Sequence, residues 1–345
     1  MKGVWKFFGD LDRAAMKAIV HDRLDSRAVA ERYGCLLGVA DINISVARGE
    51  IFCVMGLSGS GKSTLLRHIN RLLEPSAGDV FIDGESIMAK SPAELRALRA
   101  HKIGMVFQSF GLLPHRTVRD NVALPLEIQS VSKQRRYDAA EEALAKVNLS
   151  GWGDRYCHEL SGGMQQRVGL ARALAANSSI LLMDEPFSAL DPLIRRQLQD
   201  EFLALSRSMN KTVVFITHDL DEAIRIGDRI AIMKDGVIIQ IGIPEEIVTA
   251  PIHEYVARFV ADISRLNVVT ARRIMMPVVD FLVRDGVQLD VAQLVQVSER
   301  DPLATLVELA ARSLDPLAVT DGGGNIVGII DRQTLLKGLS KGREP

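Results

Sequence analysis

The most chemically informative segment of the sequence is a glycine-rich loop that ends in a lysine and a serine. Residues 56–63 read GLSGSGKS, which fits the pattern G-x-x-x-x-G-K-[ST], and they follow the apolar run of residues 51–55. Glycines let the backbone curl so that its N–H groups face phosphate oxygens, and the N-terminus of a following helix adds positive potential. Lys62 would reach the β- and γ-phosphates, and the Ser63 hydroxyl would bind Mg²⁺. The expected contacts with a nucleoside triphosphate are Gly56, Leu57, Ser58, Gly59, Ser60, Gly61, Lys62, Ser63 and Thr64.

A pair of acidic residues stands at the end of another apolar run. Residues 180–183, ILLM, are followed directly by Asp184 and Glu185. A carboxylate at a strand tip can hold Mg²⁺, usually through water, and this is the role that we assign to Asp184. Glu185 would then lie beside the γ-phosphate and orient or deprotonate the attacking water. The alternative, two solvated acids at a strand end, would be credible if the pair stood alone in the sequence.

A segment shortly before this strand predicts a second anion site. Residues 160–167, LSGGMQQR, place a serine and two glycines at the start of a predicted helix. The free N–H groups of that helix N-terminus would face an anion, whereas the alternative is an ordinary helix cap with a glycine pair. Within one chain this site lies far from the first, so both could meet one nucleotide only in a head-to-tail dimer. The segment resembles the signature sequence of ATP-binding cassette (ABC) ATPases.

The resemblance to ABC ATPases covers about residues 30–250 and implies roles for further residues. The residues on the ATP of the opposite protomer would be Ser161, Gly162, Gly163 and Gln165. The Mg²⁺ ligands would be Ser63, Gln108 and Asp184, and the catalytic residues would be Gln108, Glu185 and His218. Asp191, in the segment SALD, would cross the dimer interface. Tyr33, which stands 23 residues before Gly56, would stack on adenine.

The elements that must position these residues follow from the distribution of apolar side chains. Residues 51–55, 180–183 and 212–217 are typical of strands buried on both faces of a parallel sheet, separated by helical sequence. This pattern predicts a doubly wound α/β fold. Residues 109–175 read as mostly helical. The resemblance implies that residues 33–265 form a P-loop NTPase of the ABC type, with a RecA-like core, an antiparallel β subdomain and an α-helical subdomain.

The two ends of the chain read differently from the middle. Residues 1–32 look helical and amphipathic, which predicts an N-terminal helical extension packed on the main domain, with a membrane-surface helix as the alternative. Residues 266–345 predict a small α+β domain, and LAVTDGGGNIVGII at 317–330 resembles a CBS module. Asp331 and Thr334 reverse the order of the ribose-binding [ST]-x-x-D pattern of such modules. We therefore favour a structural or dimerising module over a nucleotide sensor.

Composition argues against several classes of protein. The chain has 345 residues, of which 47% are hydrophobic and 25% charged, and a net charge of −1, so no global field attracts nucleic acid. The sequence contains no run of about 18 apolar residues, the length that a helix needs to span a bilayer. Residues 1–20 lack the apolar core of a signal peptide. The three cysteines are scattered without a C-x-x-C pair, which favours free thiols over a zinc site or a disulfide framework. We expect a cytoplasmic protein, held at the inner face of the membrane by its partners.

A closer resemblance is to the ATPases of glycine betaine, proline and choline importers. It rests on the stretches MGLSGSGKST, INRLLEPSAGDV, FQSFGLLPHRTVRDNV, FSALDPLIRR and HDLDEAIRIGDRIAIMKDG. It implies ATP and Mg²⁺ as cofactors, a homodimer, two transmembrane permease subunits that the Gln108 loop contacts, an extracytoplasmic substrate-binding protein, and no nucleic acid. The alternatives are the ATPase of an amino-acid importer, for example of histidine, an export ATPase, and a soluble ABC ATPase of translation or DNA repair. The last class usually carries two cassettes or a long coiled-coil insertion, and this sequence has neither.

Overall fold

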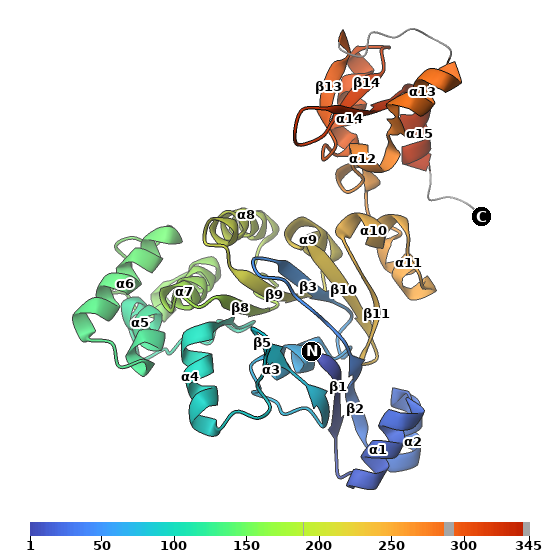
Figure 1. The fold of residues 1–345 in the computed structure, drawn as a ribbon. Coiled ribbons are helices and arrows are strands. Elements are labelled where there is room, and N and C mark those ends of the chain that lie inside the picture. Colours follow the sequence, from blue (N-terminus) through green and yellow to red (C-terminus); the bar gives the residue numbers. More distant parts are fainter. Residues whose placement is uncertain (189, 286–292, 341–345) are drawn as a thin grey trace. The chain divides into compact units, whose positions relative to one another are not determined.

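The computed structural model describes residues 1–188, 190–285 and 293–340 of the chain (Figure 1). The chain divides into two compact units, Met1–Ile241 and Gly242–Pro345. In the described part of the chain, no helix has both the length and the apolar character needed to cross a bilayer.

The first unit is built around a six-stranded sheet with the strand order β11-β10-β3-β9-β8-β7. In chain order these strands are β3 (Ile51–Met55), β7 (Ile103–Val106), β8 (Ile180–Asp184), β9 (Thr212–Thr217), β10 (Arg229–Lys234) and β11 (Val237–Gly242). Neighbouring strands from β10 to β7 run parallel. All residues of β3 are buried, as its uninterrupted apolar sequence predicts. Because the carboxyl ends of parallel strands lie at one edge, the loops that follow β3, β7, β8 and β9 meet there.

Helices cover both faces of this sheet. Figure 1 shows α8 (Pro192–Ser208) and α9 (Leu220–Ile226) on one face and α3 (Lys62–Ile69) on the other. On the first face, the ring of Phe187 lies 5.9 Å from that of Phe215 in β9. On the α3 face, a core cluster joins the sheet to neighbouring strands and includes Phe52, Val54, Leu65, Leu66, Val80 and Ile82. Burial of these side chains from water holds α3 against the sheet.

The segment that was expected to be mainly helical contains three helices. They are α5 (Val118–Ile128), α6 (Lys133–Lys146) and α7 (Gly162–Ala175), and α4 (Pro92–Lys102) precedes them. Side-chain caps mark two of their starts, because Thr117 accepts a hydrogen bond from Asp120 N and Ser161 accepts one from Met164 N. Figure 1 shows α5, α6 and α7 gathered beside β7 and β8.

The N-terminal segment corrects the prediction of a continuous helical extension. Residues Lys2–Phe8 form strand β1, which pairs antiparallel with β2 (Leu36–Ile42) and β4 (Ala77–Asp79), and only afterwards come α1 (Arg13–Asp22) and α2 (Ser26–Tyr33). The adjacent residues Val4 and Trp5 are both buried, in separate apolar clusters. A strand points successive side chains to opposite faces and so buries both, which a surface helix cannot do. A short hairpin of β5 (Phe81–Ile82) and β6 (Glu85–Ser86) follows β4.

The second unit begins at Gly242, before residue 266, where we placed the start of the C-terminal domain. Its first helices are α10 (Pro244–Thr249), α11 (Glu254–Val260) and α12 (Ala271–Ile274). A four-stranded sheet of order β12-β15-β14-β13 follows, made of β12 (Met276–Pro277), β13 (Val295–Ser298), β14 (Leu317–Thr320) and β15 (Ile326–Ile330). Helices α13 (Val278–Asp285), α14 (Leu303–Arg312) and α15 (Arg332–Ser340) accompany it. The order strand, helix, strand, turn, strand, helix agrees with the sequence-based expectation.

Candidate nucleotide-binding site

The glycine-rich loop connects β3 to α3 and leaves the N-terminus of α3 open. Gly61 is the N-cap of α3, with φ +97°, and no side chain caps the helix. A Cβ on Gly56 would lie 2.4 Å from Met233 O, and one on Gly61 would lie 2.5 Å from Gly38 O. Both positions therefore require glycine, because the backbone of neighbouring segments approaches too closely for a side chain. The first N–H groups of α3 remain available to an anion.

Lys62 is drawn into this loop. Its side chain is 5% exposed, and its Nζ donates hydrogen bonds to Gly56 O at 2.8 Å and Leu57 O at 3.0 Å. The same Nζ lies 4.0 Å from Glu185 Oε1. Burial lowers the pKa of Lys62, while the charges of Glu185 and Asp184 oppose that shift. A phosphate entering the loop would give this cation a partner of opposite charge in place of two backbone carbonyls.

Ser63 and Asp184 form a pair of oxygen donors at the tips of α3 and β8. Ser63 Oγ donates a hydrogen bond to Asp184 Oδ1 at 3.0 Å. Burial raises the pKa of Asp184, and the Ser63 hydrogen bond acts in the opposite direction. In the described part of the chain, no group of three His, Cys, Asp or Glu residues could hold a metal alone. The pair therefore fits Mg²⁺, which usually keeps several waters and binds one or two protein oxygens together with substrate phosphates.

The side chain of Glu185 contacts residues that follow two other strands of the sheet. Its Oε2 lies 3.0 Å from His218 Nδ1 and accepts a 3.4 Å hydrogen bond from Gln108 Nε2. These residues follow β8, β9 and β7, respectively. The backbone of Glu185 is left-handed, with φ +45°, and its N–H donates to Ile216 O at 3.0 Å. This conformation is costly for a residue with a Cβ, and such strain is commonly concentrated at functional sites.

The predicted second anion site lies at the N-terminus of α7. Ser161 caps the helix through its Oγ, which accepts from Met164 N at 3.4 Å, and both Ser161 and Gly162 are exposed. A Cβ on Gly162 would meet no heavy atom within 4 Å, whereas one on Gly163 would lie 3.0 Å from a side-chain carbon of α8. Gln165 instead binds its own segment, since its Nε2 donates to two backbone carbonyls of residues 157–160, at 3.0 and 3.2 Å. The helix N-terminus thus faces open space, with Gln165 holding the preceding loop.

Two further predicted residues lie in different surroundings. Asp191 is the exposed N-cap of α8, and its side chain makes no capping hydrogen bond. Tyr33 ends α2 and packs against the apolar cluster that contains Trp5 and Phe7, so its ring is engaged in the N-terminal core. An exposed Asp191 fits an interface position, whereas the packing of Tyr33 does not favour a role in stacking on adenine.

An aromatic residue that the sequence interpretation missed, Phe8, lies near the loop. Phe8 ends β1 and is 38% exposed. A carbon of its ring would be 2.6 Å from a Cβ placed on Gly38, whose carbonyl oxygen in turn abuts Gly61 of the loop. The helical interpretation of residues 1–32 concealed it, although Phe8 and Gly9 at the end of an apolar stretch could have indicated a strand end.

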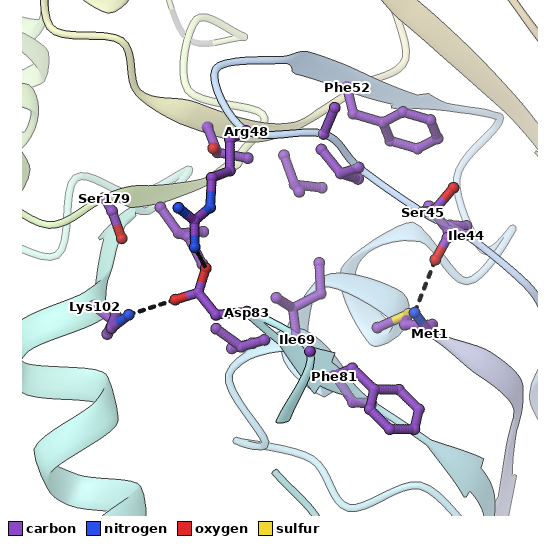
Figure 2. Close-up of a pocket in the computed structure, with 18 of the residues that line it drawn as sticks. Met1, Ile44, Ser45, Arg48, Phe52, Ile69, Phe81, Asp83, Lys102 and Ser179 are labelled. Atoms are coloured by element: carbon purple, nitrogen blue, oxygen red, sulfur yellow. Dashed lines mark hydrogen bonds and ion pairs between the residues drawn. The ribbon is translucent and has the colours of Figure 1, made fainter. Parts of the chain in front are cut away.

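A cavity of about 910 Å³ lies elsewhere in the first unit (Figure 2). Figure 2 shows Phe52, Ile69 and Phe81 on its walls and an ionic group at one side, where Asp83 contacts both Arg48 and Lys102. The lining includes residues at the start of β8 and β9, whereas the predicted site residues lie at or beyond strand carboxyl ends. None of the predicted site residues lines this cavity.

Comparison with known proteins agrees with this geometry. Residues 39–188 match a family model described as ABC transporter. The glycine betaine transport ATP-binding protein OpuAA of Bacillus subtilis is 53% identical over 272 residues, which are 79% of this chain and 65% of OpuAA, just under two thirds of its length. ProV of Salmonella typhimurium, of a glycine betaine/proline betaine transport system, is 51% identical over 79% of this chain and 68% of its own length. The chain belongs to the family of ABC transporter ATP-binding proteins.

Other relatives extend this assignment. TmoW of Ruegeria pomeroyi, the ATP-binding protein of a trimethylamine N-oxide transport system, is 46% identical over 99% of this chain and 96% of its own. Among solved structures, the cassette MJ0796, a dimer in a post-hydrolysis state bound to ADP and Pi, has a TM-score of 0.59 and 34% identity over 70% of this chain and 97% of that one. The expected fold, an ABC cassette with P-loop NTPase architecture, is confirmed, and the chain is an ABC-type ATPase.

Proposed function

We propose that this chain is the ATP-hydrolysing subunit of an importer for a small quaternary-amine solute of the glycine betaine, proline betaine or choline type. The observation that carries the catalytic part is the convergence of Gln108 and His218 on the Glu185 carboxylate. The transporter class rests on the names of relatives that are about half identical to this chain over the aligned residues. Specificity for the solute would reside in the partner subunits.

In this proposal ATP binds with its phosphates over the glycine-rich loop and the N-terminus of α3. Lys62 would contact the β- and γ-phosphates. Ser63, Asp184 and Gln108 would hold Mg²⁺, which would supply positive charge beside the phosphate oxygens. Glu185 accepts a proton from the attacking water on a carboxylate oxygen. His218 and Gln108 hold that carboxylate in place, so that the water can attack in line with the leaving oxygen.

We also propose a head-to-tail homodimer. The N-terminus of α7 is exposed, its Gly162 faces open space, and the first turn of the helix contains no acidic residue. A second copy would bring its ATP phosphates to Ser161, Gly162 and Gly163, and Asp191 would lie at the interface. Opening and closing of this dimer would drive two transmembrane permease subunits, with an extracytoplasmic binding protein delivering the solute. The chain would then be peripheral at the inner face of the membrane.

Trimethylamine N-oxide is the second candidate solute. TmoW covers nearly the whole chain end to end, whereas OpuAA and ProV are longer than their aligned parts. Agreement over the full length includes the short C-terminal unit, which in this chain follows the cassette. The alignment with TmoW thus takes in both units of this chain, and its solute is tested beside the betaines.

The domain boundaries form part of the proposal. Residues 1–32 would be an extension of β1, α1 and α2, residues 33–265 the ATPase domain and residues 266–345 a CBS-like module of structural or dimerising role. The contacts of Asp331 argue against a role in binding ribose. Its carboxylate already accepts a hydrogen bond from Thr334 N at 2.6 Å and pairs with Arg284. A carboxylate with these partners has less freedom to bind a sugar hydroxyl.

Uptake by cells that carry the operon tests the proposed function. Labelled glycine betaine, choline, proline, histidine and trimethylamine N-oxide are compared between the native chain and Lys62→Ala. We expect uptake of one betaine-type solute or of trimethylamine N-oxide to depend on Lys62, whose loss should weaken ATP binding. Lys102→Ala, on the Figure 2 cavity, is the matched control and should transport normally. Dependence for none of the solutes, with ATPase activity retained, would contradict the importer class.

A further inference from the structure

A buried arginine connects α7 to the loop that follows Gln108. Arg172, in the last turn of α7, is 7% exposed, and its guanidinium donates to Gly111 O at 2.5 Å and Phe110 O at 2.8 Å. Among the described residues it has no carboxylate partner within ion-pair distance. A buried cation held only by backbone carbonyls is costly, and burial accordingly lowers the pKa of Arg172. An apolar side chain at this position would pack in the core without the cost of burying a charge.

The carbonyls that Arg172 holds belong to an unusual turn. Phe110 and Gly111 both have left-handed backbones, with φ +61° and +58°, and a Cβ on Gly111 would lie 3.0 Å from the ring of Phe107. A left-handed conformation is unfavourable for Phe110, because its Cβ crowds the following carbonyl oxygen. The two hydrogen bonds from one planar guanidinium compensate for this conformation and orient both carbonyls toward α7. The turn therefore depends on α7 for its shape.

The far end of the same loop is attached to α5. Asn121 is fully buried; its Oδ1 accepts from Leu113 N at 2.7 Å, and its Nδ2 donates to Leu113 O at 3.0 Å and Thr117 O at 2.9 Å. Residues 109–113 are thus fixed to two helices. Gln108, directly before them, instead reaches the Glu185 carboxylate of the sheet.

From these contacts we infer that Arg172 is a positioning residue that couples the N-terminus of α7 to the placement of Gln108 at the catalytic carboxylate. Helix α7 carries Ser161 at its cap and Arg172 eleven residues along, about 16 Å away at the rise of an α-helix. A shift of the helix when its N-terminus meets the partner's ATP moves Arg172 and the attached turn. Gln108, two residues before Phe110, moves with it. This inference rests on the proposed function, because it assumes turnover in a dimer.

A double-mutant cycle on the full-length chain tests the coupling. Arg172→Lys keeps the charge but lacks the planar fork that holds two carbonyls. We expect kcat to fall about tenfold, within the range of residues that act through coupling, with the KM for ATP and the ATP affinity of the isolated chain nearly unchanged. If Arg172 acts through Gln108, Gln108→Ala combined with Arg172→Lys should lose no more kcat than Gln108→Ala alone.

The matched control is Arg119→Lys, a helical-subdomain arginine whose carboxylate partners Glu141 and Asp154 a lysine can also satisfy. It should keep the native kcat. Additive losses in the double variant, or a kcat loss explained by a lower unfolding temperature and a smaller folded fraction, would overturn the inference. An unchanged kcat in Arg172→Lys would do the same. A native chain without ATPase activity would instead contradict the proposed function, and the inference would fall with it.

Discussion

Helices α3 and α7 both begin in glycine-rich sequence, but their N-termini lie in different surroundings. At α3 no side chain caps the helix, Lys62 is buried in the loop, and Asp184 and Glu185 lie beside it on the sheet. At α7, Ser161 caps the helix, and Gly162 faces open space. Residues at the ends of parallel strands lie beside the N-terminus of α3, whereas a short 3-10 turn, Cys157–Glu159, precedes the N-terminus of α7. In the proposed dimer, one chain would therefore supply most of one phosphate site and part of a second.

The largest expected effect comes from breaking the first site at its catalytic carboxylate. Glu185→Gln should lower ATP turnover about a thousandfold, the scale of a lost general base. ATP should still bind, because Lys62 and the loop are untouched, and the dimer should remain closed. Phosphate release and size-exclusion chromatography with ATP measure the two effects. Steady hydrolysis by this variant would contradict the assignment of Glu185 as the base.

The second site is tested by placing a negative charge at the N-terminus of α7. Gly162→Asp has room for its Cβ, and an acid in the first turn favours the helix, so the variant should fold. It should repel the partner's ATP phosphates and lower turnover by at least about tenfold, the size of a lost charge-assisted contact. ATP binding by the isolated chain should not change, as measured by titration with a fluorescent analogue. Gly162→Ala is the neutral control, and equal losses in both variants would contradict the electrostatic explanation.

A further prediction concerns which aromatic residue, Phe8 or Tyr33, contacts the base of ATP. Phe8→Ala should weaken ATP binding roughly tenfold, within the range of one aromatic stacked on a base, and Phe8→Tyr should restore it. Tyr33→Ala should leave the affinity unchanged while lowering thermal stability, because Tyr33 packs in the N-terminal cluster. Titration of the three variants with ATP decides the matter. Loss of affinity only in Tyr33→Ala would support Tyr33, and not Phe8, as the residue that stacks on adenine.

The smallest effect concerns a buried acid behind the first site. Glu222 accepts a hydrogen bond from Gln199 Nε2 at 2.9 Å, and burial raises its pKa. A raised folded-state pKa means that this group's contribution to stability is full below its unfolded pKa, about 4.3. That contribution is lost as the pH rises through the folded value. Glu222→Gln should therefore raise the unfolding free energy at neutral pH and flatten its dependence on pH. Urea unfolding, measured from below the unfolded pKa up to neutral pH, gives the unfolding free energy of both chains. An unchanged dependence on pH in the variant would contradict the role of Glu222.

Local sequence determined the first site almost completely. Strand β3, the loop and α3 are contiguous, so their glycines, lysine and serine predict the fold and the chemistry together. Asp184 ends one strand whose apolar sequence already indicates burial, and Glu185 follows it. His218 follows another such strand, and the resemblance to ABC ATPases assigned its role. Parallel strands then bring these ends to one edge without further information. The family, the fold and the ATPase activity followed from those motifs.

What only the tertiary structure decided depends on contacts between segments distant in the chain. The sequence predicted a helix where the structure has strand β1. This segment is a strand because it pairs with β2 and β4, about 30 to 70 residues away, and this pairing outweighs local preference. The same pairing places Phe8 near the glycine-rich loop, and Tyr33 packs against the apolar cluster that contains Trp5 and Phe7. Arg172 likewise acquires its partners only when α7 packs beside the Gln108 loop. Hydrogen bonds and burial across such distances leave no periodic trace in the sequence, so they had to be seen in the fold.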